Sequence, residues 1–385
     1  MGKYISIFIY LTGFFLSAKL FEVRKRVATK GKFICVLFSI MILVLLAGLR
    51  GETVGTDVLV YVKPLYSGAL KIGSFTSYMA AFPKIDIGYL CVVYYITKLF
   101  KTLSAVLIVT AIITYVPIFV VAEYFEKEKG IKGSIILLCY DLLFFNLTLN
   151  AVRQSVAISF VLLCFIYIDS QHWEKAVISA VIAQMFHNSA ILGIAILIFS
   201  FFTYRVENKK KRFGYMCVFI ILFAVIGPNI GNIIGYFVQK GVLSEKMNVY
   251  LDVFLGGDNS KSYMFEMSKG MIFVAALKLG TLVIPAFLGT TYTKSKTFEM
   301  VKMNTMIGVF SYCVLYFAFK SIYVYRITLY GEIFATLWMA YSGSNIATKR
   351  LEASTRNIII IIYAIAYWYI NYVLLGLHQT LPYVI

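Results

Sequence analysis

The sequence predicts an all-α integral membrane protein that crosses the bilayer about 12 times. The chain has 385 residues, of which 61% are hydrophobic and only 14% are charged, and one soluble core could not enclose that much apolar surface. Apolar runs close to the roughly 20 residues that cross the hydrocarbon recur along the chain. The basic residues, which give a net charge of +18, gather in short loops between these runs. That arrangement orients membrane helices and argues against a nucleic-acid partner.

Most of the crossings can be read directly from the apolar runs. They are predicted at about 4–21, 33–49, 103–122, 134–149, 151–168, 213–230, 270–289, 303–320, 326–343 and 357–376. The first run lacks a cleavage site of small residues, so we expect it to remain as the first crossing. The six cysteines lie inside apolar segments and form no CxxC or Cys/His pair, so neither a disulfide framework nor a zinc site is indicated.

Two further segments fit the bilayer poorly. As helices, residues 86–100 would extend about 22 Å and residues 176–204 about 43 Å, against a hydrocarbon core of roughly 30 Å. In one topology, 86–100 lies along the outer interface and 176–204 is a hairpin that turns near His187. In the other, 86–100 crosses and 176–204 is one long helix. The number of Lys and Arg residues in the loops does not distinguish these two topologies. We predict the hairpin, because it keeps a polar Gln-His-Asn-Ser cluster away from the middle of the bilayer.

We predict a single membrane-embedded domain over residues 1–385, with both termini outside. In the preferred topology two long segments face outward, 50–102 and 231–269. Segments of this length in a compact domain usually carry function.

Polar residues interrupt the apolar runs between Asn150 and Ser189. Arg153 and Gln154 lie in NAVRQSVA, and His187 lies in AQMFHNSA. An arginine costs about 2.5–3.5 kcal/mol at the bilayer centre, so ionisable residues in such runs indicate a functional site. We predict that both clusters reach one wet face and bind an anion. In the structural alternative, His187 is neutral and is satisfied by its neighbours in sequence.

Three arginines lie outside in this topology, each near the end of a crossing: Arg50, Arg153 and Arg326. A guanidinium binds phosphate oxygens in pairs, so three at headgroup depth predict a lipid that carries a diphosphate. Each could instead snorkel to the interface. Asp57 and His187 are candidate bases for a sugar hydroxyl.

Several polar residues keep a structural alternative or receive no role. Asp57 could cap the helix that begins DVLVYV, or pair with Arg50. Asp141, Lys278 and Glu332 lie inside apolar runs, where they would pair within the bundle or line a groove for a polar ligand. We assign no role to His172 or His378.

Four motifs, in this order, resemble the EpsG family, a branch of the Wzy-type polysaccharide polymerases. They are GLRGETVGTDVLVYVKPL (48–65), DIGYLCVVYYITKLF (86–100), NAVRQSVAISF (150–160) and AQMFHNSAI (183–191). The matching positions are Arg50, Val54, Gly55, Thr56, Asp57, Tyr61, Asp86, Gly88, Tyr89, Arg153, Gln154, Ala157, Phe186, His187, Ser189 and Ala190. YRITLY (325–330) resembles an Arg-bearing helix start in the family's second half. The sequence departs from the family at Asp86, where Glu is more usual, and at Ile87, where Pro commonly lies.

The resemblance implies a metal-independent glycosyltransferase with a GT-C-like fold and no cofactor, whose active site faces outward from the plasma membrane. Such an enzyme joins oligosaccharide repeat units carried on undecaprenyl diphosphate into an O-antigen, capsule or exopolysaccharide, and releases the lipid diphosphate. Its partners would be the lipid-linked donor and acceptor, membrane lipid, a chain-length regulator and a flippase, without nucleic acid. The alternatives are a polysaccharide ligase and, less favoured, a transporter, which should show repeats with broken helices in matching halves.

Together, the residues and the resemblance give a candidate site. His187 and Asp57 are the catalytic candidates. Arg153, Arg326 and Arg50 would bind the diphosphate. The supporting residues would be Gln154, Asn150, Asp86 and Tyr89.

Overall fold

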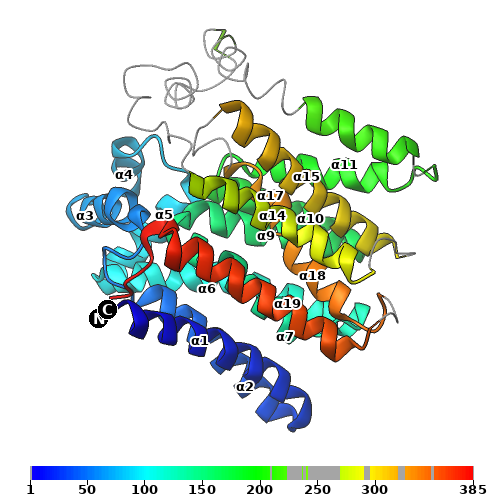
Figure 1. Cartoon of the computed structure of the whole chain (residues 1–385). Coiled ribbons are helices and arrows are strands. Elements are labelled where there is room, and N and C mark those ends of the chain that lie inside the picture. The colour runs from blue at the N-terminus through cyan, green and yellow to red at the C-terminus, as the bar shows by residue number, and fades with distance from the viewer. Residues whose placement is uncertain are drawn as a thin grey trace. The chain divides into compact units, whose positions relative to one another are not determined.

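The computed structural model describes residues 2–208, 210–222, 236, 240–241, 269–289, 295–319, 326–347 and 351–384 (Figure 1). Every regular element in these ranges is a helix, which confirms the all-α prediction. Six helical stretches are long and apolar enough to cross a membrane: Lys3–Arg26, Thr29–Gly48, Leu103–Lys129, Gly133–Asn150, Val152–Asp169 and Ala353–Leu374. The predicted outward segment 231–269 lies almost wholly outside the described residues.

The contacts group the chain into two compact units. Unit 1 comprises Met1–Ile191, Phe287–Thr291 and Thr336–Ile385, and unit 2 comprises Leu192–Ala286 and Tyr292–Ala335. Five of the predicted crossings in unit 1 begin and end within a few residues of the observed helices, because long apolar runs specify helices that satisfy their own backbone hydrogen bonds in lipid.

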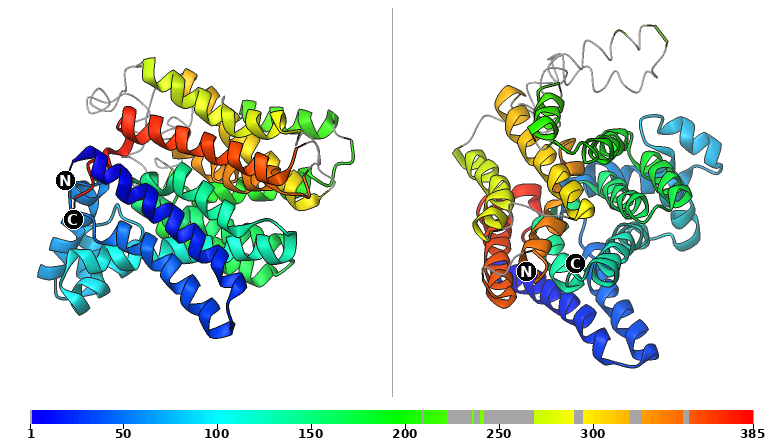
Figure 2. Two further views of the ribbon diagram at one scale, coloured as in Figure 1. Left: turned by 60° about the horizontal axis from the view of Figure 1, so that its bottom comes forward. Right: turned by 90° about the vertical axis from the view of Figure 1, so that its right-hand side faces the viewer.

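Unit 1 begins with a helical hairpin, seen clearly in Figure 2, and continues through a set of short helices before the long spans. Its elements are α1 (Lys3–Val23), η1 (Arg24–Arg26), α2 (Thr29–Gly48), η2 (Val58–Val62), α3 (Lys63–Lys71), α4 (Phe75–Ala81), α5 (Ile87–Phe100), α6 (Leu103–Lys129), α7 (Gly133–Tyr140), η3 (Asp141–Phe145), α8 (Asn146–Asn150), α9 (Val152–Asp169), α10 (Trp173–Phe186), α18 (Ala335–Gly343), α19 (Ala353–Trp368), η6 (Tyr369–Leu374) and η7 (Leu377–Gln379). The helices α1 and α2 expose large apolar side chains such as Phe8 (69% exposed) and Phe33 (70%), as a lipid-facing surface should.

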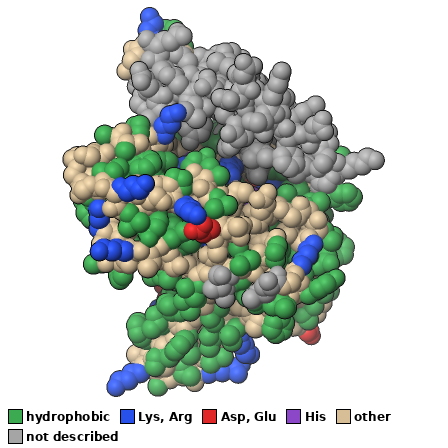
Figure 3. Space-filling view, turned by 90° about the vertical axis from the view of Figure 1, so that its left-hand side faces the viewer, with side chains coloured by type: hydrophobic (Ala, Val, Ile, Leu, Met, Phe, Trp, Pro, Cys, Tyr) green, Lys and Arg blue, Asp and Glu red, His purple; other side chains and the backbone are tan. Residues whose placement is uncertain are grey.

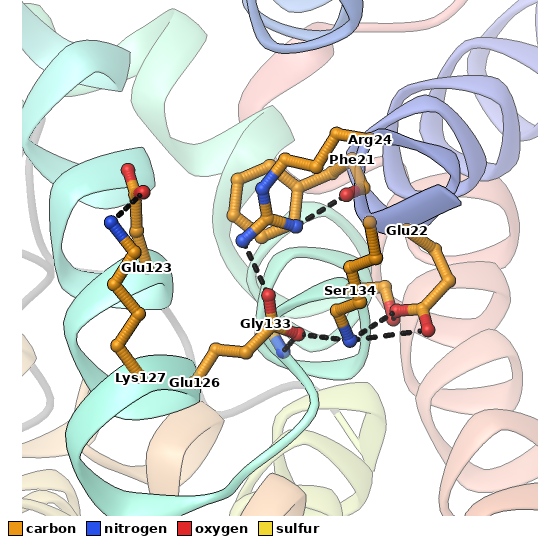
Figure 4. Close-up of polar contacts among 9 residues, drawn as sticks. Phe21, Glu22, Arg24, Glu123, Glu126, Lys127, Gly133 and Ser134 are labelled. Carbon is orange, nitrogen blue, oxygen red and sulfur yellow. Dashed lines mark hydrogen bonds and ion pairs between the residues drawn. The ribbon is translucent and has the colours of Figure 1, made fainter. Parts of the chain in front are cut away.

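One end of unit 1 is clamped by charges (Figure 4). Arg24 and Lys25 both bind Glu126 near the end of α6, and Lys25 Nζ lies 2.6 Å from Glu126 Oε1. The same oxygen accepts the backbone N–H of Gly133 at 2.9 Å, and Ser134 at the start of α7 donates to Glu22. We call this the basic end. Because η1 and the α6–α7 turn meet there, the basic loops 24–32 and 127–132 lie on the same side of the bundle.

The opposite end of unit 1, which we call the distal end, carries loop 50–57 and both chain termini, which lie side by side in Figures 1 and 2. The backbone N–H of Tyr383 donates to Ser6 Oγ at 2.8 Å. Gly48 at the end of α2 packs against Ile108 near the start of α6. The chain therefore leaves α2 and enters α6 at the same end.

This geometry selects the topology in which 86–100 does not cross. An element between α2 and α6 that crossed once would deliver α6 to the basic end, whereas α6 begins at the distal end and runs to Glu126. At 14 residues, α5 is also only about 21 Å long. Residues 176–204 are likewise not one long helix, because α10 ends at Phe186 and His187 takes extended backbone (φ −156°, ψ 122°).

Three π-helical segments in the described part of unit 1 adjoin the distal end. η2 follows loop 50–57, η3 precedes α8, and η6 leads into the last residues of the chain. π-Helical turns are rare and occur frequently at functional sites. An aromatic core of Tyr10, Phe14, Phe145 and Trp368 packs beside them, and Trp368 Nε1 donates to Asn146 Oδ1 at 2.6 Å.

Unit 2 is also helical where it is described. Its elements are α11 (Ala190–Thr203), a helix over residues 210–222, α14 (Lys269–Phe287), α15 (Lys296–Phe319) and α17 (Leu329–Glu332). Arg212 binds Glu299 on α15 at 3.1 Å. The buried Lys278 on α14 pairs with the buried Glu332 on α17, so these two residues do pair within the bundle.

Candidate functional site

The side-chain amide of Asn150 binds loop 50–57 to the junction between α8 and α9. Asn150 is buried, and its Oδ1 accepts both the hydroxyl of Thr56 and the backbone N–H of Asp57, the latter at 3.3 Å. Gly55 has φ +85°, and a Cβ there would lie 2.5 Å from the carbonyl oxygen of Leu149. Only glycine fits both the backbone conformation and the close approach.

Gly55→Ala should therefore destabilise the protein. Left-handed backbone costs an alanine about 1–2 kcal/mol, and displacement of the Leu149 carbonyl adds to that. Thermal unfolding of the purified chain in detergent measures the loss. Gly73→Ala is the matched control, since a Cβ at Gly73 meets no atom within 4 Å. Equal melting of both variants would contradict the proposed seating of the loop.

Arg50 joins the ends of two helices. Its side chain is buried, with Nη1 donating to the carbonyl of Ala47 in the last turn of α2 and Nη2 donating to the carbonyl of Leu149 in α8 at 3.1 Å. Carbonyls in a last helical turn carry partial negative charge and need donors. Burial lowers the pKa of the Arg50 guanidinium from its ordinary value, but an arginine remains protonated in proteins. These contacts give Arg50 a structural task at the distal end.

Asp57 caps a helix, though not the one that follows it in sequence. Its Oδ2 accepts the backbone N–H of Val152, the first residue of α9, at 3.3 Å, while its side chain makes no capping bond to η2. A carboxylate at a helix N-terminus satisfies an unpaired donor and favours the helix dipole. Asp57 thereby fixes the start of α9, one residue before Arg153.

Arg153 pairs with Asp86 across the distal end. Its Nη1 lies 3.1 Å from Asp86 Oδ2, and the two side chains are 16% and 9% exposed. The guanidinium also lies over the ring of Tyr61, 5.4 Å from its centre. The carboxylate that departs from the family's usual Glu therefore does reach the arginine. A planar guanidinium carries five donors, so one contact with a carboxylate oxygen uses a small part of its capacity.

His187 ends α10 and is half-buried. The backbone N–H of Ser189 points at His187 Nδ1 from 3.3 Å, and the Ser189 hydroxyl lies 2.6 Å from the same atom. A backbone N–H can only donate, so Nδ1 accepts and the proton of the neutral ring is on Nε2. In this tautomer Nε2 of His187 is a hydrogen-bond donor.

The distal end brings most of the predicted site residues of unit 1 into one neighbourhood. α5 packs against α10, and Gly88 lies against the backbone of Met185, which places the start of α5 beside the end of α10. Tyr89 is fully buried, and Arg153, Arg50 and Asp57 are electrostatic neighbours of its hydroxyl. Gln154 is buried on α9.

Arg326 belongs to unit 2, where it is half-buried two residues before Thr328. Thr328 donates to Glu332, which also binds Lys278. These contacts do not involve a ligand, and the diphosphate-binding role of Arg326 remains a prediction.

His378, to which the sequence assigned no role, lies beside Asn150. Its Nδ1 lies 3.1 Å from Asn150 Nδ2, so the last residues of the chain return to the seat of loop 50–57. Histidine with φ 68° carries no recognisable signal in the sequence, and the contact joins residues 228 positions apart. In the sequence, only Gly376, two residues before His378, indicates a turn.

The face that carries the termini is chemically mixed. Figure 3 shows hydrophobic and neutral polar surface with scattered lysine and arginine side chains and a few acidic ones, one of them beside a basic side chain. Within the described ranges, no group of three or more His, Cys, Asp or Glu side chains is placed to hold a metal ion. What the distal end offers is a set of hydrogen-bond donors and one carboxylate-paired guanidinium.

Comparisons with known proteins identify the family of the chain. The family model of the EpsG family matches residues 33–385, which is most of the chain. No curated protein matches the chain, and no solved structure matches it.

Proposed function

Because this chain belongs to the EpsG family, a family of membrane proteins of polysaccharide biosynthesis, we propose that it is a polysaccharide polymerase. It joins oligosaccharide repeat units carried on undecaprenyl diphosphate at the outer face of the plasma membrane. The proposal includes about 12 crossings and a GT-C-like fold. The observation that carries it is the half-buried Arg153, held over Tyr61 by Asp86 at the end of unit 1 opposite the basic loops.

In this proposal the growing chain on its carrier is the donor, and the lipid diphosphate is the leaving group. The bond from the terminal sugar to the diphosphate breaks as the hydroxyl of the incoming unit attacks that sugar. Negative charge develops on the diphosphate oxygens, and fixed donors stabilise such charge most when they need not reorganise. Arg153 supplies a planar guanidinium that can bind two phosphate oxygens, and Arg50 holds the ends of α2 and α8. Arg326 is the proposed second cation.

His187 would donate from Nε2 to an oxygen of the diphosphate or sugar, because its Nδ1 accepts the Ser189 N–H. Asp57 is the remaining candidate for the proton of the attacking hydroxyl. Gln154, Asn150 and Tyr89 support these groups. Holding a lipid-tethered donor against a lipid-tethered acceptor contributes much of the remaining rate.

A deletion strain tests the reaction class. Loss of a polymerase should leave single repeat units on the carrier lipid, and a plasmid copy of the chain should restore the polymer. Carrier lipids are extracted and their glycans are sized by mass spectrometry. Long polymer that stays on the carrier would identify a ligase instead. Repeat units confined to the inner leaflet would identify a transporter.

A further inference from the structure

Residues 376–384, which we call the C-terminal segment, form a strained turn at the distal end. Gly376, His378 and Gln379 have φ values of 63°, 68° and 51°. Left-handed backbone suits glycine but is uncommon for other residues. Two successive non-glycine residues in this conformation persist only where the surrounding contacts hold them, and such strain clusters at functional sites.

The C-terminal segment is hydrogen-bonded to loop 50–57. Gly55 N–H donates to the carbonyl of Gln379 at 3.0 Å, and Gly51 N–H donates to that of Val384 at 2.6 Å. Further contacts tie the segment to α1 and α8: Tyr10 Oη to Thr380 O at 3.0 Å, Asn146 Nδ2 to Thr380 Oγ1 at 2.8 Å, and Tyr383 N to Ser6 Oγ at 2.8 Å. Loop 50–57 therefore lies between the segment and the α8–α9 junction.

The contact between His378 and Asn150 has a defined direction. Asn150 Oδ1 accepts from Thr56 and from the backbone N–H of Asp57, which can only donate. The NH₂ group of the amide therefore faces the imidazole, where Asn150 Nδ2 lies 3.1 Å from His378 Nδ1. Nδ1 must accept, so the ring is neutral and carries its proton on Nε2.

We propose that His378 is a positioning residue of the site and acts in its neutral form. It holds the Asn150 amide, which holds Thr56 and Asp57, and Asp57 caps α9 directly before Arg153. Protonation of Nδ1 sets an N–H against the amide NH₂. Asn150 cannot turn its oxygen to the ring without losing its hydrogen bonds with the Thr56 hydroxyl and the Asp57 N–H.

The effect on substrate rests on the proposed function, whereas the link from His378 to loop 50–57 does not. The elements that pack against η7 are η6, α8 and loop 50–57, with Tyr10 of α1 bound to the next residue. Their titratable groups are Tyr369, Tyr372, Arg50, Glu52, Asp57 and Tyr10, and α8 has none. The Tyr372 ring lies 6.0 Å from that of His378. The ordinary pKa values of all these side-chain types lie below 5 or above 9, so a change between about pH 5.5 and 7.5 reports on histidine.

Hydrogen–deuterium exchange of peptides covering residues 51–57 tests the link in the purified full chain without ligand. After correction for intrinsic rates, wild-type exchange should be about tenfold faster at about pH 5.5 than at about pH 7.5, the factor expected for one hydrogen bond. His378→Asn keeps an acceptor and tolerates left-handed backbone, so it should remain protected at both pH values. His378→Leu should exchange fast at both. Gln379→Leu places the same side chain at the neighbouring left-handed position and should behave as wild type.

Two results would overturn the inference: wild-type protection that does not change with pH, or a pH dependence that survives in His378→Asn. Binding of undecaprenyl diphosphate to the same proteins forms the second arm. Its affinity should fall at acidic pH in wild type by about tenfold more than in His378→Asn. If exchange follows the proposal but undecaprenyl diphosphate does not bind at any pH, the proposed function fails and the role of His378 at the loop stands.

Discussion

Arg153→Ala should reduce polymer formation by about 10²–10³-fold, the loss typical for removal of one fixed donor that stabilises developing charge. Arg153 is half-buried, and we propose that its guanidinium binds two oxygens of the lipid diphosphate. Single repeat units should accumulate on the carrier lipid of the variant strain. The measurement is the length distribution of carrier-linked and released polymer, with the amount of membrane-inserted protein matched between strains.

Arg153→Lys separates charge from geometry. A lysine keeps the cation but cannot bind two phosphate oxygens in parallel, so activity should remain well below that of wild type. Lys63→Ala is the matched control. Lys63 begins α3, directly after η2, and its pair with Glu52 is 47% and 44% exposed. Such surface pairs contribute little. Wild-type chain lengths in Arg153→Ala would remove Arg153 from the mechanism, and full activity in Arg153→Lys would remove the need for a fork.

The same position reports on orientation. In a cysteine-free background, a cysteine at position 153 or 187 should react with a membrane-impermeant maleimide added to intact cells. Reaction only after permeabilisation would place the distal end in the cytoplasm, and the outward-facing site would then have to be abandoned.

Glu332→Leu should strongly destabilise unit 2. Its two carboxylate oxygens bind Lys278 and Thr328, and all three side chains are buried. Lys278 also lies 4.3 Å from the ring centre of Tyr312. Removing one partner leaves an uncompensated charge in the interior, at a cost of about 3–5 kcal/mol. Lys278→Met should lower the melting temperature similarly.

The double variant Lys278→Met/Glu332→Leu provides the control. Apolar replacement of a whole buried ion pair is often neutral or stabilising, so the double variant should melt near or above wild type in detergent. Single variants that melt like wild type would show that the pair contributes nothing. If the double variant is stable but makes no polymer, the pair has a role in the reaction beyond holding α14 to α17.

The lengths and ends of the long helices were accessible from sequence because they depend on local information. An apolar run of suitable length forms a helix in lipid whatever its neighbours, since its backbone must satisfy itself. The predicted runs 151–168 and 134–149 accordingly appear as Val152–Asp169 and Gly133–Asn150, whereas the helix predicted at 103–122 continues to Lys129. The topology of short apolar segments could not be predicted in this way. The length of 86–100 was compatible with two topologies, and contacts of Gly48 with Ile108 and of Arg24 with Glu126 decided between them.

The contacts that the motif residues make could not be predicted from the sequence. Asp57 and Arg50 were predicted at the site, yet the structure binds Asp57 to the start of α9 and Arg50 to the ends of α2 and α8. The partner of a side chain depends on which helix ends meet in space. Capping patterns can be recognised from sequence only when the cap adjoins its own helix.

By itself, the sequence determined that this is an all-helical membrane protein of the EpsG family with its unusual polar residues in 50–57, 86–89, 150–154 and 184–189. A membrane-spanning helix is specified by about 20 consecutive apolar residues, so it can be recognised from a local sequence pattern. Only the tertiary structure decided that Arg153 pairs with Asp86, 67 residues away, and that His378 returns to Asn150. Contacts between distant residues form where helix ends converge and depend on packing of the whole unit, which no local pattern encodes.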